Sequence, residues 1–187
     1  MNSTYYIIIV VAVLVIAGII LAPILARRNR SQNLRNKFGE EYDHAVQVVG
    51  DEKKAQVELE ERQKRVKKLN ILPLSASDRE RYLVDWAAVQ SKFVDEPGQA
   101  ILDADRLIME VMQLRAYPLS DFDQRAADIS VMYPNLVSNY RAARAIAIKN
   151  EQQLADTEEL RQAMIYYRPL FEELLGKESV VKEEKLR

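Results

Sequence analysis

The chain has 187 residues, with 27 Lys and Arg against 28 Asp and Glu, one His and no Cys. A net charge of -1 argues against a protein that binds nucleic acid through its overall field, and the absence of Cys excludes disulfides and Cys-ligated zinc. One His excludes zinc sites built on several histidines, and five Gly leave little room for a phosphate-binding loop. The sequence therefore predicts no cofactor, no metal site and no specific nucleic-acid partner.

An apolar segment near the N-terminus is the strongest feature. Residues 5–26 read YYIIIVVAVLVIAGIILAPILA and contain no charge. As a helix they are about 33 Å long, enough to cross a hydrocarbon core of about 30 Å. A cleaved signal peptide, the alternative, would have basic residues before its apolar run, but here they follow it. We interpret residues 1–26 as a transmembrane anchor that contacts membrane lipid through residues 5–26.

The charges around this segment predict its orientation. Basic residues near a membrane span stay on the cytoplasmic side. None precedes the segment, whereas five follow it before the first acid, Glu40. We expect a short N-terminus outside the cell membrane, the remainder in the cytoplasm, and five side chains at the membrane interface, namely Arg27, Arg28, Arg30, Arg35 and Lys37.

Residues 27–70 are predicted to form a basic juxtamembrane segment and a charged helical stalk. Apolar residues recur at helical spacing in two stripes, and Gly50 and Asp51 interrupt the pattern between them. A coiled coil is an alternative, but the heptad is not sustained because Arg62 occupies what would be a core position. Five basic residues lie between Arg62 and Lys68, where they suit the C-terminal end of a helix or, alternatively, a phosphate- or lipid-binding patch.

Residues 71–176 are predicted to form an all-α bundle of about five helices, because apolar residues recur at intervals of three and four. Ser77 to Glu80 has capping-box spacing for the first helix, and Pro97 restarts the chain for the second. The third is expected to stop at Tyr133, and Pro134 is expected to be the first residue of the fourth.

The fifth predicted helix begins at Asp156, which is followed by acids that suit the first turn. Gly176 is expected at its C-terminal end, and Pro169 is expected to kink or break it. The last segment, residues 177–187, is charged and poor in large apolar side chains. We expect it to be a disordered tail.

Several stretches between Leu34 and Gly176 resemble a family of bacterial proteins. They are LRNKFGEEYDHAV, DEKKAQVELEERQKRVKKL, ILPLSASDRERY, FDQRAADISVMYPNLVSNYRAARAIA and DTEELRQAMIYYRPLFEELLG. The family that they resemble is uncharacterised and has one N-terminal hydrophobic segment with a helical remainder. The resemblance implies the same architecture here, and it supplies no catalytic or ligand residues.

The best candidate site lies on the third and fourth predicted helices of the bundle. Arg and Tyr are residue types that make good interface anchors, and acids accompany them here. The alternative is structural, because acids suit the first turn of a helix and Asp121 lies four residues before Arg125. The candidate partner-binding residues are Asp121, Arg125, Asp128, Tyr140 and Arg144.

The leading functional hypothesis is a single-pass, membrane-tethered helical interaction or scaffold protein that is not an enzyme. No catalytic motif is found, since the single His44 has no nucleophile or orienting group beside it. The expected partner is a protein, and self-association is left open. The alternative is a small-ligand binder or an enzyme that uses an Asp, Arg and Tyr site, and an electrostatic role on anionic lipid or nucleic acid is a third hypothesis.

Overall fold

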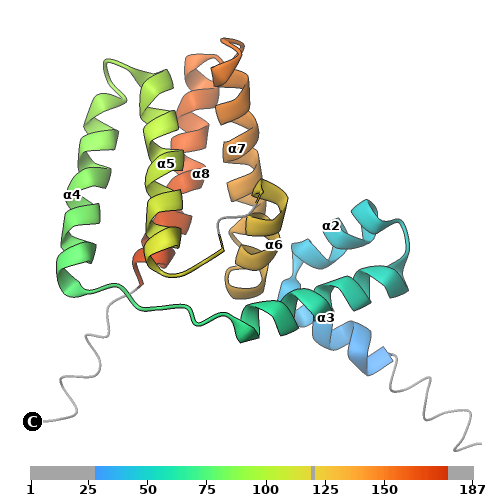
Figure 1. The fold of residues 1–187 in the computed structure, drawn as a ribbon. Helices are drawn as coiled ribbons and strands as arrows, with labels where there is room; N and C mark the ends of the chain where they lie inside the picture. Colours follow the sequence, from blue (N-terminus) through green and yellow to red (C-terminus); the bar gives the residue numbers. More distant parts are fainter. Residues whose placement is uncertain (1–27, 119–120, 177–187) are drawn as a thin grey trace, which may run out of the picture. The chain divides into compact units, whose positions relative to one another are not determined.

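The computed structural model describes residues 28–118 and 121–176, and within these ranges all regular structure is helical (Figure 1). The prediction of an all-α chain is therefore confirmed. The anchor predicted at 1–26 and the tail predicted at 177–187 lie outside the described residues. Among the helices that the structure does describe, none is long and apolar enough to cross a membrane.

Helices follow one another along the described chain with short connections. Residues 28–38 are helical. The further helices are α2 (Glu40–Val49), α3 (Glu52–Lys68), α4 (Ala76–Lys92), α5 (Pro97–Leu114), α6 (Phe122–Met132), α7 (Val137–Glu151) and α8 (Thr157–Leu175). The chain divides into two compact units, one up to Leu59 and the other from Glu60, so α3 begins in the first unit and ends in the second.

The first unit is a small helical fold rather than a straight stalk. Gly50 ends α2 in the left-handed conformation, with φ at 73°, and its N–H donates to the carbonyl of Val46 at 2.9 Å. The predicted interruption at Gly50 is thus confirmed, and it turns the chain back. Tyr42 on α2 then donates to Glu52 at the start of α3, at 2.7 Å. Buried side chains give this unit its own interior, and they are Leu34, Phe38, Tyr42, Ala45, Ala55 and Leu59.

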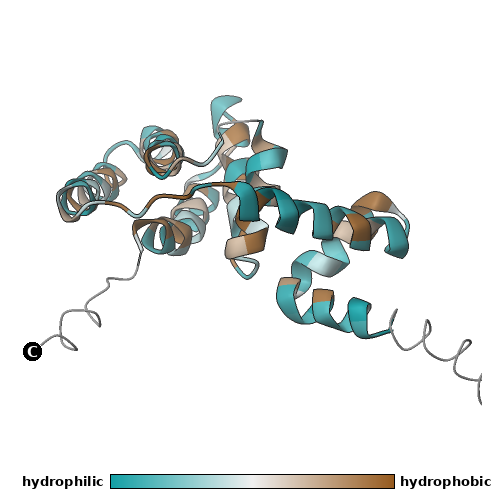
Figure 2. Cartoon of the chain, turned by 60° about the horizontal axis from the view of Figure 1, so that its bottom comes forward, coloured by the Kyte–Doolittle hydropathy of each residue, from teal (hydrophilic) through white to brown (hydrophobic). Residues whose placement is uncertain are grey.

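The second unit is a helical bundle, as predicted. α5 packs against α4, α7 and α8, α8 also packs against α7, and the shorter α6 packs against α7 (Figure 1). Figure 2 shows that α3, whose last turns belong to this unit, is mostly hydrophilic along its length. The apolar core of the bundle is therefore built from α4 to α8.

Aromatic side chains join the helices of the bundle core. The rings of Trp86 on α4 and Phe171 on α8 are stacked, with centroids 4.4 Å apart and an interplanar angle of 16°. Tyr140 on α7 meets Tyr167 on α8 edge to face at 6.3 Å. Burying a large apolar side chain stabilises a fold by about 1.5–3 kcal/mol, so this packing fixes how the helices are arranged.

Local capping signals place most helix ends where the sequence predicts them. Pro97 is the first residue of α5, and Tyr133 follows the last residue of α6. Asp156 and Glu159 form a complete capping box at the start of α8, and Gly176 follows its end with φ at 76°. These ends are fixed by residue chemistry within one turn, which is why the sequence alone reveals them.

Two predicted helix starts are wrong by two or three residues. α4 begins at Ala76, because the side chain of Ser75 accepts a hydrogen bond from the backbone N–H of Asp78 at 3.0 Å. The earlier serine thus replaces Ser77 as the cap. α7 begins at Val137 and not at Pro134, since the chain first makes a turn in which the N–H of Leu136 donates to the carbonyl of Tyr133.

Pro169 does not break α8, so of the kink or break predicted there the break is wrong. The helix continues through it from Thr157 to Leu175. An interior proline costs about 3 kcal/mol because it removes a backbone hydrogen bond and crowds the preceding turn. Apolar burial after the proline offsets that cost, and the side chains buried there are Leu170, Phe171, Leu174 and Leu175.

Candidate functional site

The residues predicted to bind a partner lie on α6 and α7, but the structure uses them in different ways. Asp121 caps α6, since its carboxylate accepts a hydrogen bond from the backbone N–H of Gln124 at 2.9 Å. Arg125 and Asp128 lie on α6, and Tyr140 and Arg144 lie on α7. Asp128 of α6 and Tyr140 of α7 are buried inside the bundle, where a partner cannot contact them.

Arg144 belongs to a buried polar network centred on Asp105 of α5. The side chain of Arg144 donates to Oδ2 of Asp105 at 2.9 Å, and the hydroxyl of Tyr167 donates to Oδ1 of the same carboxylate at 2.9 Å. Asp105 is 4% exposed. Burial, together with the nearby Asp105 carboxylate, raises the pKa of Tyr167 far above its ordinary value, so the phenol stays protonated and donates.

Tyr140 is fully buried and packs among aromatic rings. Its ring lies 5.0 Å from that of Phe122 and 6.3 Å from that of Tyr167. Burial raises the pKa of Tyr140, and the guanidinium of Arg125 offsets part of that rise. This tyrosine therefore serves the core of the bundle and is closed to an external partner.

Asp128 connects α6 to the end of α3. This carboxylate is 1% exposed, and Arg65 donates to its Oδ1 through Nε at 2.9 Å and through Nη2 at 2.7 Å. One turn earlier on α3, the buried side chain of Arg62 donates to the hydroxyl of Ser130 at 3.3 Å. Two of the five basic residues between Arg62 and Lys68 thus hold α3 on α6.

The predicted partner-binding groove must therefore be corrected. Asp128 and Tyr140 are buried, Asp128 is paired with Arg65, and Arg144 is paired with Asp105. Sequence reasoning missed their partners because Asp105, Arg65 and Tyr167 lie far away in the chain. One signal was available for Asp105, which is an acid inside the apolar stripe of its helix and is flanked there by Ile101, Ala104 and Ile108.

A surface that the sequence analysis did not single out lies on α4. Leu83 and Val84 are 50% and 65% exposed, and Val94 just beyond the helix is 82% exposed. Helical spacing places Leu83 and Val84 in one strip with small exposed side chains, Val94 follows in the turn after the helix, and no charged residue lies among them. This strip, named here the α4 face, consists of Leu83, Val84, Ala87, Ala88, Ser91 and Val94.

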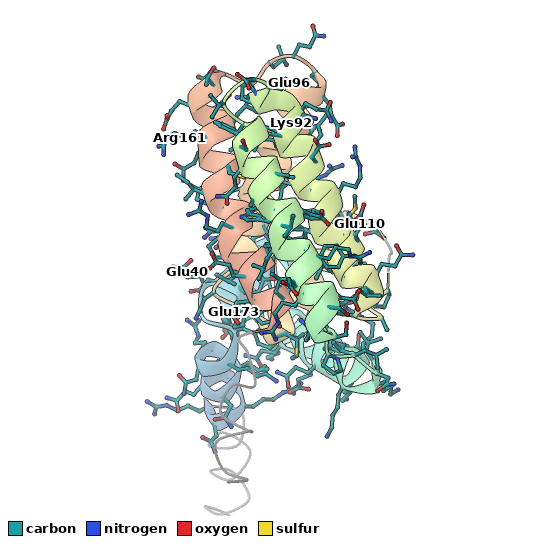
Figure 3. The ribbon with its side chains drawn as sticks, turned by 90° about the vertical axis from the view of Figure 1, so that its left-hand side faces the viewer. Glu40, Lys92, Glu96, Glu110, Arg161 and Glu173 are labelled. Carbon is teal, nitrogen blue, oxygen red and sulfur yellow. The ribbon has the colours of Figure 1, made fainter. Side chains whose placement is uncertain are left out.

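Acidic residues bound the α4 face at its two ends. Glu80 precedes it and Asp95 follows it, and both are exposed. The basic residues nearby are directed elsewhere, since Arg81 pairs with Asp78 at 3.4 Å and Lys92 pairs with Asp103 at 2.9 Å. Figure 3 views the bundle from the side of α4, with Lys92 at one end of that helix.

The first unit contains a cleft of about 440 Å³ between helical residues 28–38 and the first turns of α3. The polar residues that line it are three bases, one acid, one hydroxyl and one amide, namely Arg28, Arg30, Lys53, Glu52, Ser31 and Gln56. Two of the residues predicted at the membrane interface thus share a cleft with a lysine from another helix.

The other predicted interface residues differ in their surroundings. The guanidinium of Arg35 lies over the ring of Tyr42, 4.5 Å from its centroid, and pairs with Asp43 at 3.3 Å. Arg35 therefore helps to hold the first unit together. Lys37 is exposed, and Arg27 lies outside the described residues.

Glu52 is the acid of the cleft, and donors surround it. Tyr42 donates to its Oε1 at 2.7 Å, Ser31 at 3.3 Å and Gln56 at 3.5 Å. The hydrogen bond from Tyr42, with smaller contributions from Ser31, Arg35 and Gln56, lowers the pKa of Glu52 although desolvation opposes it. The carboxylate is therefore ionised at neutral pH.

Comparisons with known proteins give this chain no relative: no family model matches it, and no curated protein and no solved structure is significantly similar to it. Within the described ranges, no group of three or more His, Asp or Glu side chains is placed to hold a metal ion. The candidate surfaces are thus defined by their own geometry and charge.

Proposed function

We propose that this protein is a single-pass, membrane-tethered helical interaction or scaffold module whose bundle lies in the cytoplasm. The tether rests on the uncharged residues 5–26 and on the basic residues that follow them. The interaction role rests on one observation, which is the exposed and uncharged α4 face on an otherwise well-packed bundle. The resemblance to an uncharacterised family of bacterial membrane-anchored proteins agrees with this proposal.

The α4 face has the composition of the centre of a protein interface. Interface centres are depleted of charge, and their rims are polar. Here large apolar side chains lie at both ends of the strip, and Ala87, Ala88 and Ser91 lie between them. Small side chains allow another helix to approach closely, so the occupant is an α-helix that packs along α4.

Charge at the two ends selects the occupant. A second copy of α4 packed antiparallel about its midpoint would bring Glu80 of one chain close to Asp95 of the other, and a parallel pair would juxtapose identical acids. Like charges placed in this way disfavour an interface. The proposed occupant is therefore a helix of another protein, apolar on one side, with basic residues at both ends of its apolar stripe.

The alternative of an enzyme or small-ligand binder loses three of its candidate residues. Arg144 is engaged with Asp105, Asp128 is engaged with Arg65, and Tyr140 is buried in the core. Nucleic-acid binding through the basic run of α3 is also weakened as a hypothesis, since Arg62 and Arg65 bond to α6. The interaction module is the function that the described residues support best.

The test is site-specific photo-crosslinking of the full-length protein in its own membranes. A photoreactive residue at position 88 should capture a peptide from one other protein, and that peptide should be helical with basic ends. Ala88→Glu should abolish co-purification of the same protein, because a charge would be buried in the interface. Leu154→Glu is the matched control, since this residue is 66% exposed and lies outside the α4 face.

Two outcomes would contradict the assignment of the α4 face. Capture of a second copy of this chain at position 88 would show that the occupant is wrong. Equal loss of the partner in Ala88→Glu and Leu154→Glu would show that the binding surface is elsewhere or that binding is nonspecific.

The tether has a test of its own. Fusion of a topology reporter to the C-terminus should give activity only inside the cytoplasm, and the protein should remain with membranes after alkaline extraction. A reporter active outside the cytoplasm would contradict the orientation, and release by alkali would contradict the anchor.

A further inference from the structure

The cleft of the first unit has the chemistry of an anion site, and we propose that it binds the phosphate of an anionic phospholipid headgroup. This inference rests on the proposed membrane tether, because the tether determines what lies next to the cleft. It assigns Arg28, Arg30 and Lys53 to lipid recognition and gives the first unit a role distinct from that of the α4 face.

The donors of the cleft suit a phosphate. Guanidinium groups bind phosphate oxygens through paired N–H donors, and a lysine ammonium adds a compact charge. Arg28, Arg30 and Lys53 contribute these groups, whereas Ser31 and Gln56 direct their hydrogen bonds to Glu52. A volume of about 440 Å³ is sufficient for a headgroup but too small for a folded partner.

The single acid does not cancel the positive character of the lining. Three basic residues and one acid line the cleft. Tyr42, Ser31 and Gln56 donate to that carboxylate, and the guanidinium of Arg35 lies 3.9 Å from it. The negative charge of Glu52 is thus stabilised within the unit by Tyr42 and its neighbours, and Arg28 and Lys53 add positive charge to the lining.

The fold, and not only the sequence, assembles the cleft. Arg28 and Arg30 come from helical residues 28–38, whereas Lys53 comes from the first turn of α3. A polybasic segment next to the membrane would supply Arg28 and Arg30 from its sequence alone, but it would not supply Lys53. The turns at Gly39 and Gly50, both with positive φ, bring the lysine back to the same cleft.

The position of the cleft selects a lipid as the source of the phosphate. In the sequence, Arg28 follows the end of the apolar segment at Ala26 by only two residues. The proposed tether therefore places the cleft at the level of the headgroups on the cytoplasmic side, where anionic lipids concentrate. Free phosphate has the same chemistry but no such local concentration.

Binding is tested with the full-length protein in a nonionic detergent, titrated with short-chain phosphatidylglycerol, short-chain phosphatidylcholine or inorganic phosphate. Phosphatidylglycerol should bind at least about tenfold more tightly than either of the other two. The double variant R28Q/K53Q should weaken its binding about tenfold or more, because it removes two charged donors to the phosphate. Lys64 and Lys67 are exposed basic residues outside the cleft, so K64Q/K67Q, which removes the same charge, should bind normally.

Folding and nonspecific attraction are separated by further variants. R28K/K53R keeps both charges and should retain most of the binding, and circular dichroism should show unchanged helix content in every variant. Equal losses of phosphatidylglycerol affinity in R28Q/K53Q and K64Q/K67Q would overturn the cleft as the binding site, because they would indicate nonspecific electrostatic attraction. Equal affinity for inorganic phosphate and phosphatidylglycerol would overturn the lipid as the ligand, and unchanged binding in R28Q/K53Q would overturn the site.

The lipid site and the tether fail in different assays. Release of the protein by alkaline extraction, with phosphatidylglycerol binding in detergent intact, would contradict the tether and keep the cleft. Retention in membranes with no preference for phosphatidylglycerol in detergent would contradict the cleft and keep the tether.

Discussion

Removal of the Asp105 carboxylate should destabilise the bundle strongly. In Asp105→Ala the hydroxyl of Tyr167 loses its acceptor at 2.9 Å inside the core, and Arg144 loses its partner at 2.9 Å. Breaking a buried ion pair by removing one partner costs about 3–5 kcal/mol. Arg144 is partly exposed and also lies 3.6 Å from Glu151, which lowers the penalty, so we expect about 3 kcal/mol.

The measurement is urea and thermal unfolding of the full-length protein in detergent, with circular dichroism as the signal that reports helix content. A loss of about 3 kcal/mol should lower the unfolding midpoint of a domain of this size by about 10 °C. Asp103→Ala is the matched control on the same helix. Asp103 is paired with Lys92 and Arg106 nearer the surface, and such pairs contribute about 1 kcal/mol or less.

A double-mutant cycle tests the reasoning itself. Tyr167→Phe removes only the hydroxyl. If that hydroxyl donates to Asp105 as described, the loss of stability in the double variant should be about 1 kcal/mol smaller than the sum of the two single losses. Strictly additive effects would contradict the hydrogen bond. A loss below about 1 kcal/mol in Asp105→Ala would refute the view that the network stabilises the bundle.

Three further predictions concern the ends of α3. Tyr42→Phe should raise the pKa of Glu52, because the hydrogen bond from Tyr42 holds that pKa below its ordinary value. In the unchanged protein Glu52 therefore stabilises the fold at pH values above its unfolded pKa, and this stabilisation is lost as the pH falls through its folded pKa. An NMR titration of the Glu52 carboxyl in both proteins measures the change in pKa. Arg65→Ala should cost about 2–3 kcal/mol in urea unfolding because Asp128 loses its main partner, and a cost near zero would contradict a working ion pair. Gly50→Ala should lower the free energy of unfolding by about 1 kcal/mol because of the positive φ alone, since no atom lies within 4 Å of an added Cβ. Hydrogen exchange should become faster around the turn. Asn tolerates positive φ better than Ala does, so an equal loss in Gly50→Asn would argue against the backbone as the cause.

The ends of the helices could be predicted because each depends on a few neighbouring residues. Asp156 and Glu159 cap α8 within one turn, and Gly50 reverses the chain by its own backbone conformation. The predicted starts of α4 and α7 were wrong because more than one residue could begin each helix: Ser75 caps α4 in place of Ser77, and a turn from Tyr133 to Leu136 precedes α7. At Pro169 packing decides instead, since the core around α8 offsets the local cost of the proline.

The candidate site was harder to predict because residue type does not reveal exposure. Tyr140 and Asp128 have the chemistry of interface residues, but both are buried. Their environment depends on helices that lie far away in sequence, such as the one that carries Asp105. The α4 face was missed for the opposite reason, since Leu83 and Val84 look like core residues until the packing of the bundle shows which side of the helix is covered.

The bonds between α3 and α6 also have a mechanical consequence. In a tethered protein, tension between the anchor and a partner on the bundle runs along the chain through α3. Arg62 and Arg65 fasten the last turns of α3 to Ser130 and Asp128, so tension enters the bundle through α6 before it stretches the connector at residues 69–75. Local unfolding takes the least stable contacts first, so the end of α3 would detach from α6 while the apolar core of α4 to α8 stays folded.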